Sequence, residues 1–178
     1  MSKIRPLAFA LAALAPLMAT EAGAHATLET AEAPANAFYK AVLRVPHGCE
    51  GRPTHTVRLR VPEGVIAAKP MPKPGWQLTT VKGKYAQSYT YFGSQISEGV
   101  VEVVWSGGEL PDDWYDEFVV RVRLTDFAPG TMVYFPVVQE CADGLVHRWI
   151  EIPADGKSAH DYEEPAPGLK IVDRPSGH

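Results

Sequence analysis

The residue with the clearest capacity for chemistry is His25, because a secretion signal precedes it and cleavage after Ala24 makes it the first mature residue. A histidine at a chain start carries two nitrogen donors, the free α-amine and the imidazole Nδ1, which can chelate one metal ion. Cu(II) favours nitrogen and oxygen donors in a tetragonal arrangement. Because both nitrogens must be deprotonated, with ordinary pKa values of roughly 7.7 and 6.5, we expect copper affinity to fall below about pH 6.

The segment before His25 has the order of parts expected of a signal peptide. Lys3 and Arg5 supply a positive start, an apolar run covers 7–18, and Ala22-Gly23-Ala24 forms a small-residue cleavage signal. The apolar run is too short to anchor the chain in a bilayer. A cut two residues later also fits the small-residue rule and discards His25, but it places that bulky side chain inside the cleavage signal. We therefore prefer the first cut.

The size and charge of the chain limit its organisation and its partners. We assign residues 1–24 to the signal, 25–172 to one domain and 173–178 to a mobile tail. Of the 17 basic and 21 acidic residues, two and one lie in the signal, so the mature part keeps 15 and 20. This acidic balance argues against nucleic acid as a partner. No later stretch is apolar enough for a transmembrane anchor, and we expect a soluble protein of the periplasm.

The chain has two cysteines, Cys49 and Cys141, and both follow the signal. In an oxidising compartment an even number predicts one disulfide bond. Metal binding by the thiolates is the alternative, but their neighbours form no C-x-x-C pattern. Closing a loop of this length stabilises a fold by roughly 4 kcal/mol at most in the entropic model.

Alternation of apolar and polar residues dominates the mature part and is typical of half-buried strands. It is strict at 56–61, and the same period appears at 118–124, where Phe118, Val120, Val122 and Leu124 share one face. Further strand-like runs are 38–45, 85–92, 100–105, 132–138 and 145–152. No window keeps a helical period. Seven or more short strands separated by turn residues predict an all-β sandwich or barrel.

Several short phrases follow one another along the mature chain. They are His25-Ala26-Thr27-Leu28 with Glu32, Arg44-Val45-Pro46-His47-Gly48-Cys49, Val61-Pro62-Glu63-Gly64-Val65, Pro72-Lys73-Pro74-Gly75-Trp76, Leu110-Pro111-Asp112 with Tyr115-Asp116-Glu117-Phe118, Tyr134-Phe135-Pro136-Val137-Val138-Gln139, and Trp149-Ile150-Glu151-Ile152-Pro153. Together they resemble the YcnI-like family of exported copper-binding domains, from His25 to about Leu169.

The resemblance implies a cupredoxin-like or immunoglobulin-like β-sandwich and a Cu(II) site called a monohistidine brace. In that site a terminal histidine, a nearby carboxylate and a tryptophan surround the metal. On this chain they correspond to His25, Glu32 and Trp149. Thr30 stands where the family usually has proline, and Glu29 offers a second carboxylate. Many relatives also end in a membrane anchor, whereas we expect none in this chain.

Trp149 alternates with His147 and Glu151 on one side of its expected strand. The other side carries Val146, Ile150 and Ile152, and we expect that side to face the core. Trp149 is then expected to lie off the core, where its indole closes the axial position of the metal and attracts the cation. Solvent exposure is expected for His47, His55 and His160, whereas a contribution of His147 to the site stays open.

We expect a periplasmic Cu(II)-binding protein that acts in copper trafficking or homeostasis, passes copper to a periplasmic or membrane transport protein, and is not an enzyme. Two alternatives stay open. The first is a copper-dependent oxidative enzyme of lytic polysaccharide monooxygenase type, which needs a second imidazole in the copper plane, such as His147. The second is a metal-free periplasmic interaction module. A blue-copper carrier is not supported, because Cys141 and His147 are six residues apart and no methionine follows.

Overall fold

The fold is described by a computed structural model over residues 25–174. The predicted signal peptide lies outside these residues, as do the last four residues of the predicted tail. Arg174, at the start of that tail, donates a hydrogen bond from Nη2 to the carbonyl oxygen of Asn36 at 2.7 Å.

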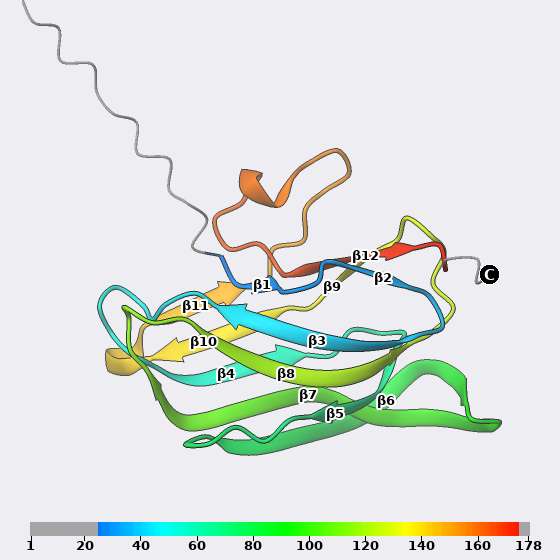
Figure 1. Ribbon diagram of the computed structural model, residues 1–178, viewed down its shortest axis with the longest axis horizontal. Coiled ribbons are helices and arrows are strands. Elements are labelled where there is room, and N and C mark those ends of the chain that lie inside the picture. The colour runs from blue at the N-terminus through cyan, green and yellow to red at the C-terminus, as the bar shows by residue number, and fades with distance from the viewer. Residues whose placement is uncertain (1–24, 175–178) are drawn as a thin grey trace, which may run out of the picture.

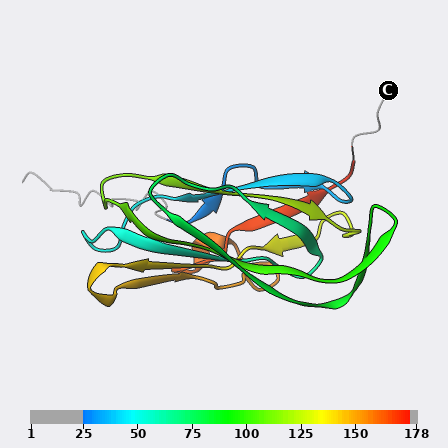
Figure 2. The ribbon, with the colours of Figure 1, turned by 90° about the horizontal axis from the view of Figure 1, so that it is seen from below.

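Two antiparallel sheets pack face to face and form a β-sandwich (Figures 1 and 2). The first sheet has the order β1-β3-β8-β5, with bounds Thr27–Leu28, Phe38–Val45, Asp116–Leu124 and Val65–Pro70. The second has the order β11-β10-β4-β7-β6, with bounds Val146–Trp149, Val137–Cys141, Thr54–Arg60, Ser94–Leu110 and Gln77–Tyr91. The predicted all-β sandwich is confirmed.

A third, small sheet lies beside the sandwich and holds the last strand of the domain. It has the order β2-β12-β9, with bounds Glu32–Pro34, Gly168–Val172 and Met132–Tyr134. Strand β12 pairs with β2 in parallel and with β9 antiparallel. Two short 3-10 turns, Ala142–Gly144 and Ala159–Asp161, are the helical elements among residues 25–174.

The core forms where the inward residues of the two main sheets meet. The expected face of β8 is buried throughout, since Phe118, Val120, Val122 and Leu124 are each at most 1% exposed. Strand β3 has the predicted bounds, and its residues pair with β8 from Phe38 to Val45. Alternation along the chain therefore predicted these buried faces correctly, because side chains on a strand point to opposite sides in turn.

The expected single strand 132–138 is instead two strands in different sheets. Strand β9 ends at Tyr134 and β10 begins at Val137, on either side of Pro136. Proline has no backbone N–H to donate to a sheet, so the chain can leave one sheet and enter another at this point. The predicted run of apolar residues was right, but its division was missed.

Three segments that are far apart in the sequence meet at one end of the sandwich, on the left in Figure 1. They are the start of β1, the loop between β3 and β4, and the edge strand β11. This end carries His25, His47 and Trp149.

Candidate metal centre

Trp149 lies in the core, contrary to the expectation that it lies off the core face. Strand β11 pairs with β10 so that Trp149 is opposite Val137, and cross-strand partners point to the same face. Val137 is fully buried, and Trp149 is only 3% exposed. The indole therefore closes the end of the core.

The expectation failed because both faces of β11 and the residues after it carry apolar side chains. Ile150 and Ile152, expected to face the core, are 45% and 59% exposed. They line an outer groove of about 400 Å³ together with Pro136 and Val138. Alternation shows which residues share a face, but it does not show which face is covered.

Two imidazoles contact the buried indole of Trp149. The ring centre of His25 lies 5.8 Å from that of Trp149, at an interplanar angle of 56°. The ring of His147 stacks on Trp149 at 5.0 Å and 25°. The structure thus brings together His25 and Trp149, as predicted, and adds His147, whose role the sequence had left open.

Gln139 holds Trp149 in place and was missed by the sequence analysis. Its Oε1 accepts a hydrogen bond from the indole Nε1–H of Trp149 at 3.0 Å. Its Nε2 donates to the Thr54 hydroxyl and to the His47 carbonyl oxygen, both at 2.7 Å. Gln139 is fully buried, and a buried amide needs such partners. One signal in the sequence could have identified Gln139. It is a polar amide at an inward-facing position of its strand, between the apolar residues Val137 and Cys141.

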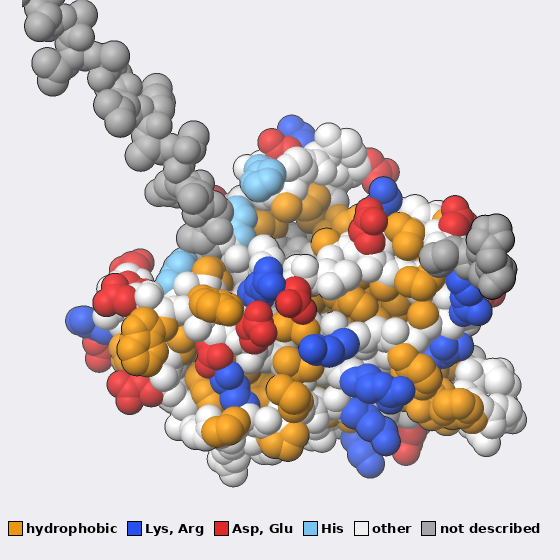
Figure 3. Space-filling model, in the orientation of Figure 1, with side chains coloured by type: hydrophobic (Ala, Val, Ile, Leu, Met, Phe, Trp, Pro, Cys, Tyr) orange, Lys and Arg blue, Asp and Glu red, His pale blue; other side chains and the backbone are white. Residues whose placement is uncertain are grey.

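His47 belongs to this cluster as well, although solvent exposure was expected. Its side chain is 29% exposed, and its ring centre lies 6.1 Å from that of His147. Its Nδ1 lies 2.6 Å from the Gly48 carbonyl oxygen and 3.9 Å from Oδ1 of Asp112. His55 and His160 are exposed as predicted. Figure 3 shows histidine side chains gathered along one edge of the molecule.

The two candidate carboxylates lie at the surface in separate ion pairs. Glu32 begins β2, its side chain is 60% exposed, and its Oε1 lies 3.7 Å from Nζ of Lys170. Glu29 lies 3.2 Å from the guanidinium of Arg44. Among residues 25–174, no three histidine, cysteine, aspartate or glutamate side chains converge as a preformed metal site. The histidine and tryptophan of the predicted brace are therefore in contact, whereas no carboxylate completes a preformed cage.

Tyr39 fixes the segment that carries both carboxylates. Its hydroxyl donates to the Thr30 carbonyl oxygen at 2.5 Å. Burial of the ring, together with the nearby charge of Glu29, raises the pKa of Tyr39 to about 12. The hydroxyl therefore stays protonated and keeps donating throughout the neutral range.

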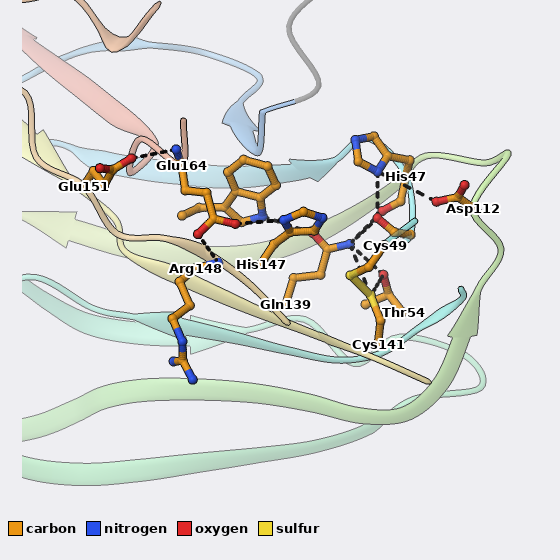
Figure 4. Close-up of polar contacts among 12 residues, drawn as sticks. His47, Cys49, Thr54, Asp112, Gln139, Cys141, His147, Arg148, Glu151 and Glu164 are labelled. Carbon is orange, nitrogen blue, oxygen red and sulfur yellow. Dashed lines mark hydrogen bonds and ion pairs between the residues drawn. A yellow bond between two sulfur atoms is a disulfide. The ribbon is translucent and has the colours of Figure 1, made fainter. Parts of the chain in front are cut away.

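The predicted disulfide between Cys49 and Cys141 is present, with Cα atoms 6.0 Å apart. Both cysteines are buried. The bond joins the loop that carries His47 to the end of β10, directly before the turn into β11 (Figure 4). It therefore ties together the two segments that supply His47 and His147.

Replacing Gln139 with leucine is expected to lower the free energy of unfolding by about 3 kcal/mol. The change leaves the Trp149 N–H and the His47 carbonyl without partners, and each unpaired buried group costs about 1–3 kcal/mol. Urea unfolding followed by tryptophan fluorescence measures it. Val138→Leu, on the outer face of the same strand, is the matched control and should change stability by less than about 1 kcal/mol. If both variants were equally stable, the hydrogen bonds of Gln139 would contribute nothing measurable to the free energy of unfolding.

These features define a disulfide-bonded, immunoglobulin-like β-sandwich domain with a histidine and tryptophan cluster at one end. The chain belongs to the family described as "Domain of unknown function (DUF1775)", which it matches over residues 25–171. This is the domain family to which YcnI-like copper-binding proteins belong, and the family description itself carries no function.

One solved structure is similar over almost its whole length. It is described as the crystal structure of an uncharacterized protein from Nocardia farcinica that reveals an immunoglobulin-like fold. The two chains are 26% identical, with a TM-score of 0.63, and the similarity covers 84% of this chain and 99% of the other. No curated protein matches the chain. Within residues 25–174, no helix is long and apolar enough to cross a membrane.

Proposed function

We propose that the mature protein is a periplasmic Cu(II) carrier that holds the ion at His25 and passes it to a copper-transport protein. The single observation that carries this proposal is the contact between the imidazole of His25 and the buried indole of Trp149. A terminal histidine supplies the amine and imidazole donors that Cu(II) favours. In the uncleaved chain the same backbone nitrogen is a peptide amide, so the site is complete only once the signal has been removed.

The position of Trp149 supports a site that holds copper without reacting. The indole is buried and hydrogen-bonded to Gln139, so it cannot swing away easily. A fixed aromatic ring beside the metal blocks approach along one direction and attracts the cation. This arrangement favours a carrier over an enzyme, which needs an open coordination position for its substrate.

Of the two carboxylates, Glu32 is the better candidate for the third ligand. Its ion pair with Lys170 is long and lies at the surface, where such pairs contribute at most about 1 kcal/mol. Glu29 is held by Arg44, whose guanidinium also contacts Glu117. Turning Glu32 toward a bound ion therefore disrupts less structure than turning Glu29.

The proximity of His147 favours one second candidate, a copper-dependent oxidative enzyme. Its imidazole stacks on the same indole as His25. However, the buried Trp149 lies against both rings, which leaves less open space for a substrate. Reductant-dependent oxidation of a polysaccharide by the copper-loaded protein tests this candidate, and we expect none. The metal-free interaction module is the remaining alternative, and failure to bind copper tightly would favour it.

An exported location is consistent with the disulfide, because such bonds persist in oxidising compartments. We place the protein in the periplasm and name copper as its cargo. Neither cysteine can offer a thiolate to Cu(I), since their sulfurs are joined to each other. We therefore expect a one-electron donor that reduces Cu(II) to Cu(I) to promote release of the ion to the transport partner.

Electron paramagnetic resonance of the mature chain with one equivalent of Cu(II) tests the proposal. We expect a single spectrum with nitrogen couplings. His25→Ala should eliminate this spectrum, and any Cu(II) signal that the variant still gives should have different couplings. Glu32→Gln should shift the spectrum, while the matched variant Glu29→Gln should leave it unchanged. A spectrum of the parent protein that survives in His25→Ala would overturn the proposed site.

A further inference from the structure

We infer that His47 and His147 form a second metal site, distinct from the terminal one, which binds Zn(II) or Cu(II) through two imidazole nitrogens. The two residues come from different parts of the chain, the loop after β3 and the edge strand β11. Their ring centres lie 6.1 Å apart, with the rings edge to face at 84°. This site does not require a free α-amine and so does not depend on the proposed carrier function.

The hydrogen bonds of both rings leave the same nitrogen free. Nδ1 of His147 lies 2.8 Å from the Glu164 carboxylate, and Nδ1 of His47 lies 2.6 Å from the Gly48 carbonyl oxygen. Both partners are acceptors only, so each Nδ1 must carry the hydrogen. In a neutral imidazole the lone pair then lies on Nε2, the atom that binds metal.

Metal-binding histidines in proteins usually have this support, with one ring nitrogen bonded to a carboxylate or a backbone carbonyl. Glu164 is itself held firmly. Its Oε2 accepts the backbone N–H of Arg148 at 3.0 Å, and its own backbone N–H donates to Glu151 at 2.7 Å. The ring of His147 is therefore fixed before any ion arrives.

The separation of the two rings suits one shared ion. A zinc–nitrogen bond is about 2.0–2.1 Å, which places an ion about 3 Å from each ring centre, so two rings on one ion lie up to about 6 Å apart. In Figure 4, the nitrogen of His147 that is not bonded to Glu164 is directed toward the side where His47 lies. Because the ring of His147 is held by Glu164, the ring of His47, whose side chain is 29% exposed, is the one that has to turn for both Nε2 atoms to reach one ion.

Charge at this position also favours a divalent cation. Oδ1 of Asp112 lies 3.9 Å from Nδ1 of His47, and Oε1 of Glu164 lies 2.8 Å from Nδ1 of His147. Each imidazole therefore has one carboxylate beside its Nδ1. No third histidine, cysteine, aspartate or glutamate joins the pair among residues 25–174. Water molecules or a ligand from a partner then fill the remaining coordination positions, as suits a site that exchanges its ion.

Zinc binding to a His25→Ala variant of the mature chain tests this inference, because that variant lacks the terminal chelate. Isothermal titration should show one Zn(II) bound, and nitrogen NMR of the histidine side chains should show the Nε2 signals of His47 and His147 shifting. Adding His47→Ala or His147→Ala should weaken binding at least about 10-fold. His55→Ala and His160→Ala, at exposed histidines, are the matched controls and should change nothing.

No Zn(II) binding to His25→Ala, or unchanged binding after loss of His47 or His147, would overturn the second site. Circular dichroism establishes that each variant is folded, and His147→Gln serves as a second variant if His147→Ala is not. The two proposals fail in different ways. Loss of the second site leaves the copper spectrum of the terminal site intact, whereas an incorrect terminal site leaves zinc binding to His25→Ala intact.

Discussion

Acetylation of the α-amine of His25 is expected to weaken Cu(II) binding by about 100-fold or more without disturbing the fold. Acetylation turns the α-amine into an amide and adds no new amine, which removes one of two chelating nitrogens while keeping the imidazole beside Trp149. Loss of an outer-shell partner alone costs about 10–100-fold in metal affinity, and loss of a direct ligand should exceed this. Competition titration with a chelator of known affinity measures the change.

The control for this experiment is the same mature chain with an unmodified α-amine. Both forms should give the same circular dichroism and the same unfolding curve. Mass spectrometry of the exported protein establishes separately that it begins at His25. If the acetylated and unmodified chains bind Cu(II) equally well, the amine takes no part and the terminal chelate is wrong.

Replacing both cysteines with serine is expected to lower the free energy of unfolding by about 4–5 kcal/mol. The bond closes a loop across 92 positions of sequence, and the entropic stabilisation grows with the length of the loop. Serine in place of Cys49 and Cys141 also puts hydroxyl groups into a buried position, beside Thr54. Because this loss is a large part of a small domain's stability, much of the protein should be unfolded at 37 °C.

Urea unfolding in the presence and absence of a thiol reductant checks this prediction. The parent protein should lose a similar amount of stability when reductant is added, whereas the double variant should be insensitive to it. The double variant should also weaken zinc binding to the His47 and His147 pair, since the disulfide fastens the loop of His47. If the free energy of unfolding of the double variant were within about 1 kcal/mol of that of the oxidised parent, the expected contribution of the disulfide to stability would be wrong.

The local pattern of the sequence was a sufficient guide to much of the fold. Alternation located the buried face of β8, and the predicted bounds of β3 are those observed. The pairing of the two cysteines also followed from their number, because only one disulfide can form between them. These features depend on the period of a strand or on a count of residues, both of which are visible without knowing what lies opposite.

The pattern was a poor guide where two surfaces compete for burial. The run around 146–152 is apolar on both sides, and the sequence analysis chose the side with Ile150 and Ile152 as the core. The register with β10 decides otherwise, because it places Trp149 opposite the buried Val137. Which of two apolar faces is covered depends on neighbouring strands that come from elsewhere in the chain.

The candidate site also combines residues that the sequence identifies with contacts that only the structure shows. His25 could be singled out from the sequence alone, because its proposed role comes from the predicted cleavage signal that precedes it. The link of Gln139 to Trp149 and to the loop of His47 could not, because its three partners come from different strands and loops. The sequence by itself determined one disulfide and a set of alternating strands, and it predicted a terminal histidine. Only the tertiary structure decided that Trp149 lies against His25 and that His147 stacks on the same indole, because strand register and burial arise from contacts between distant segments.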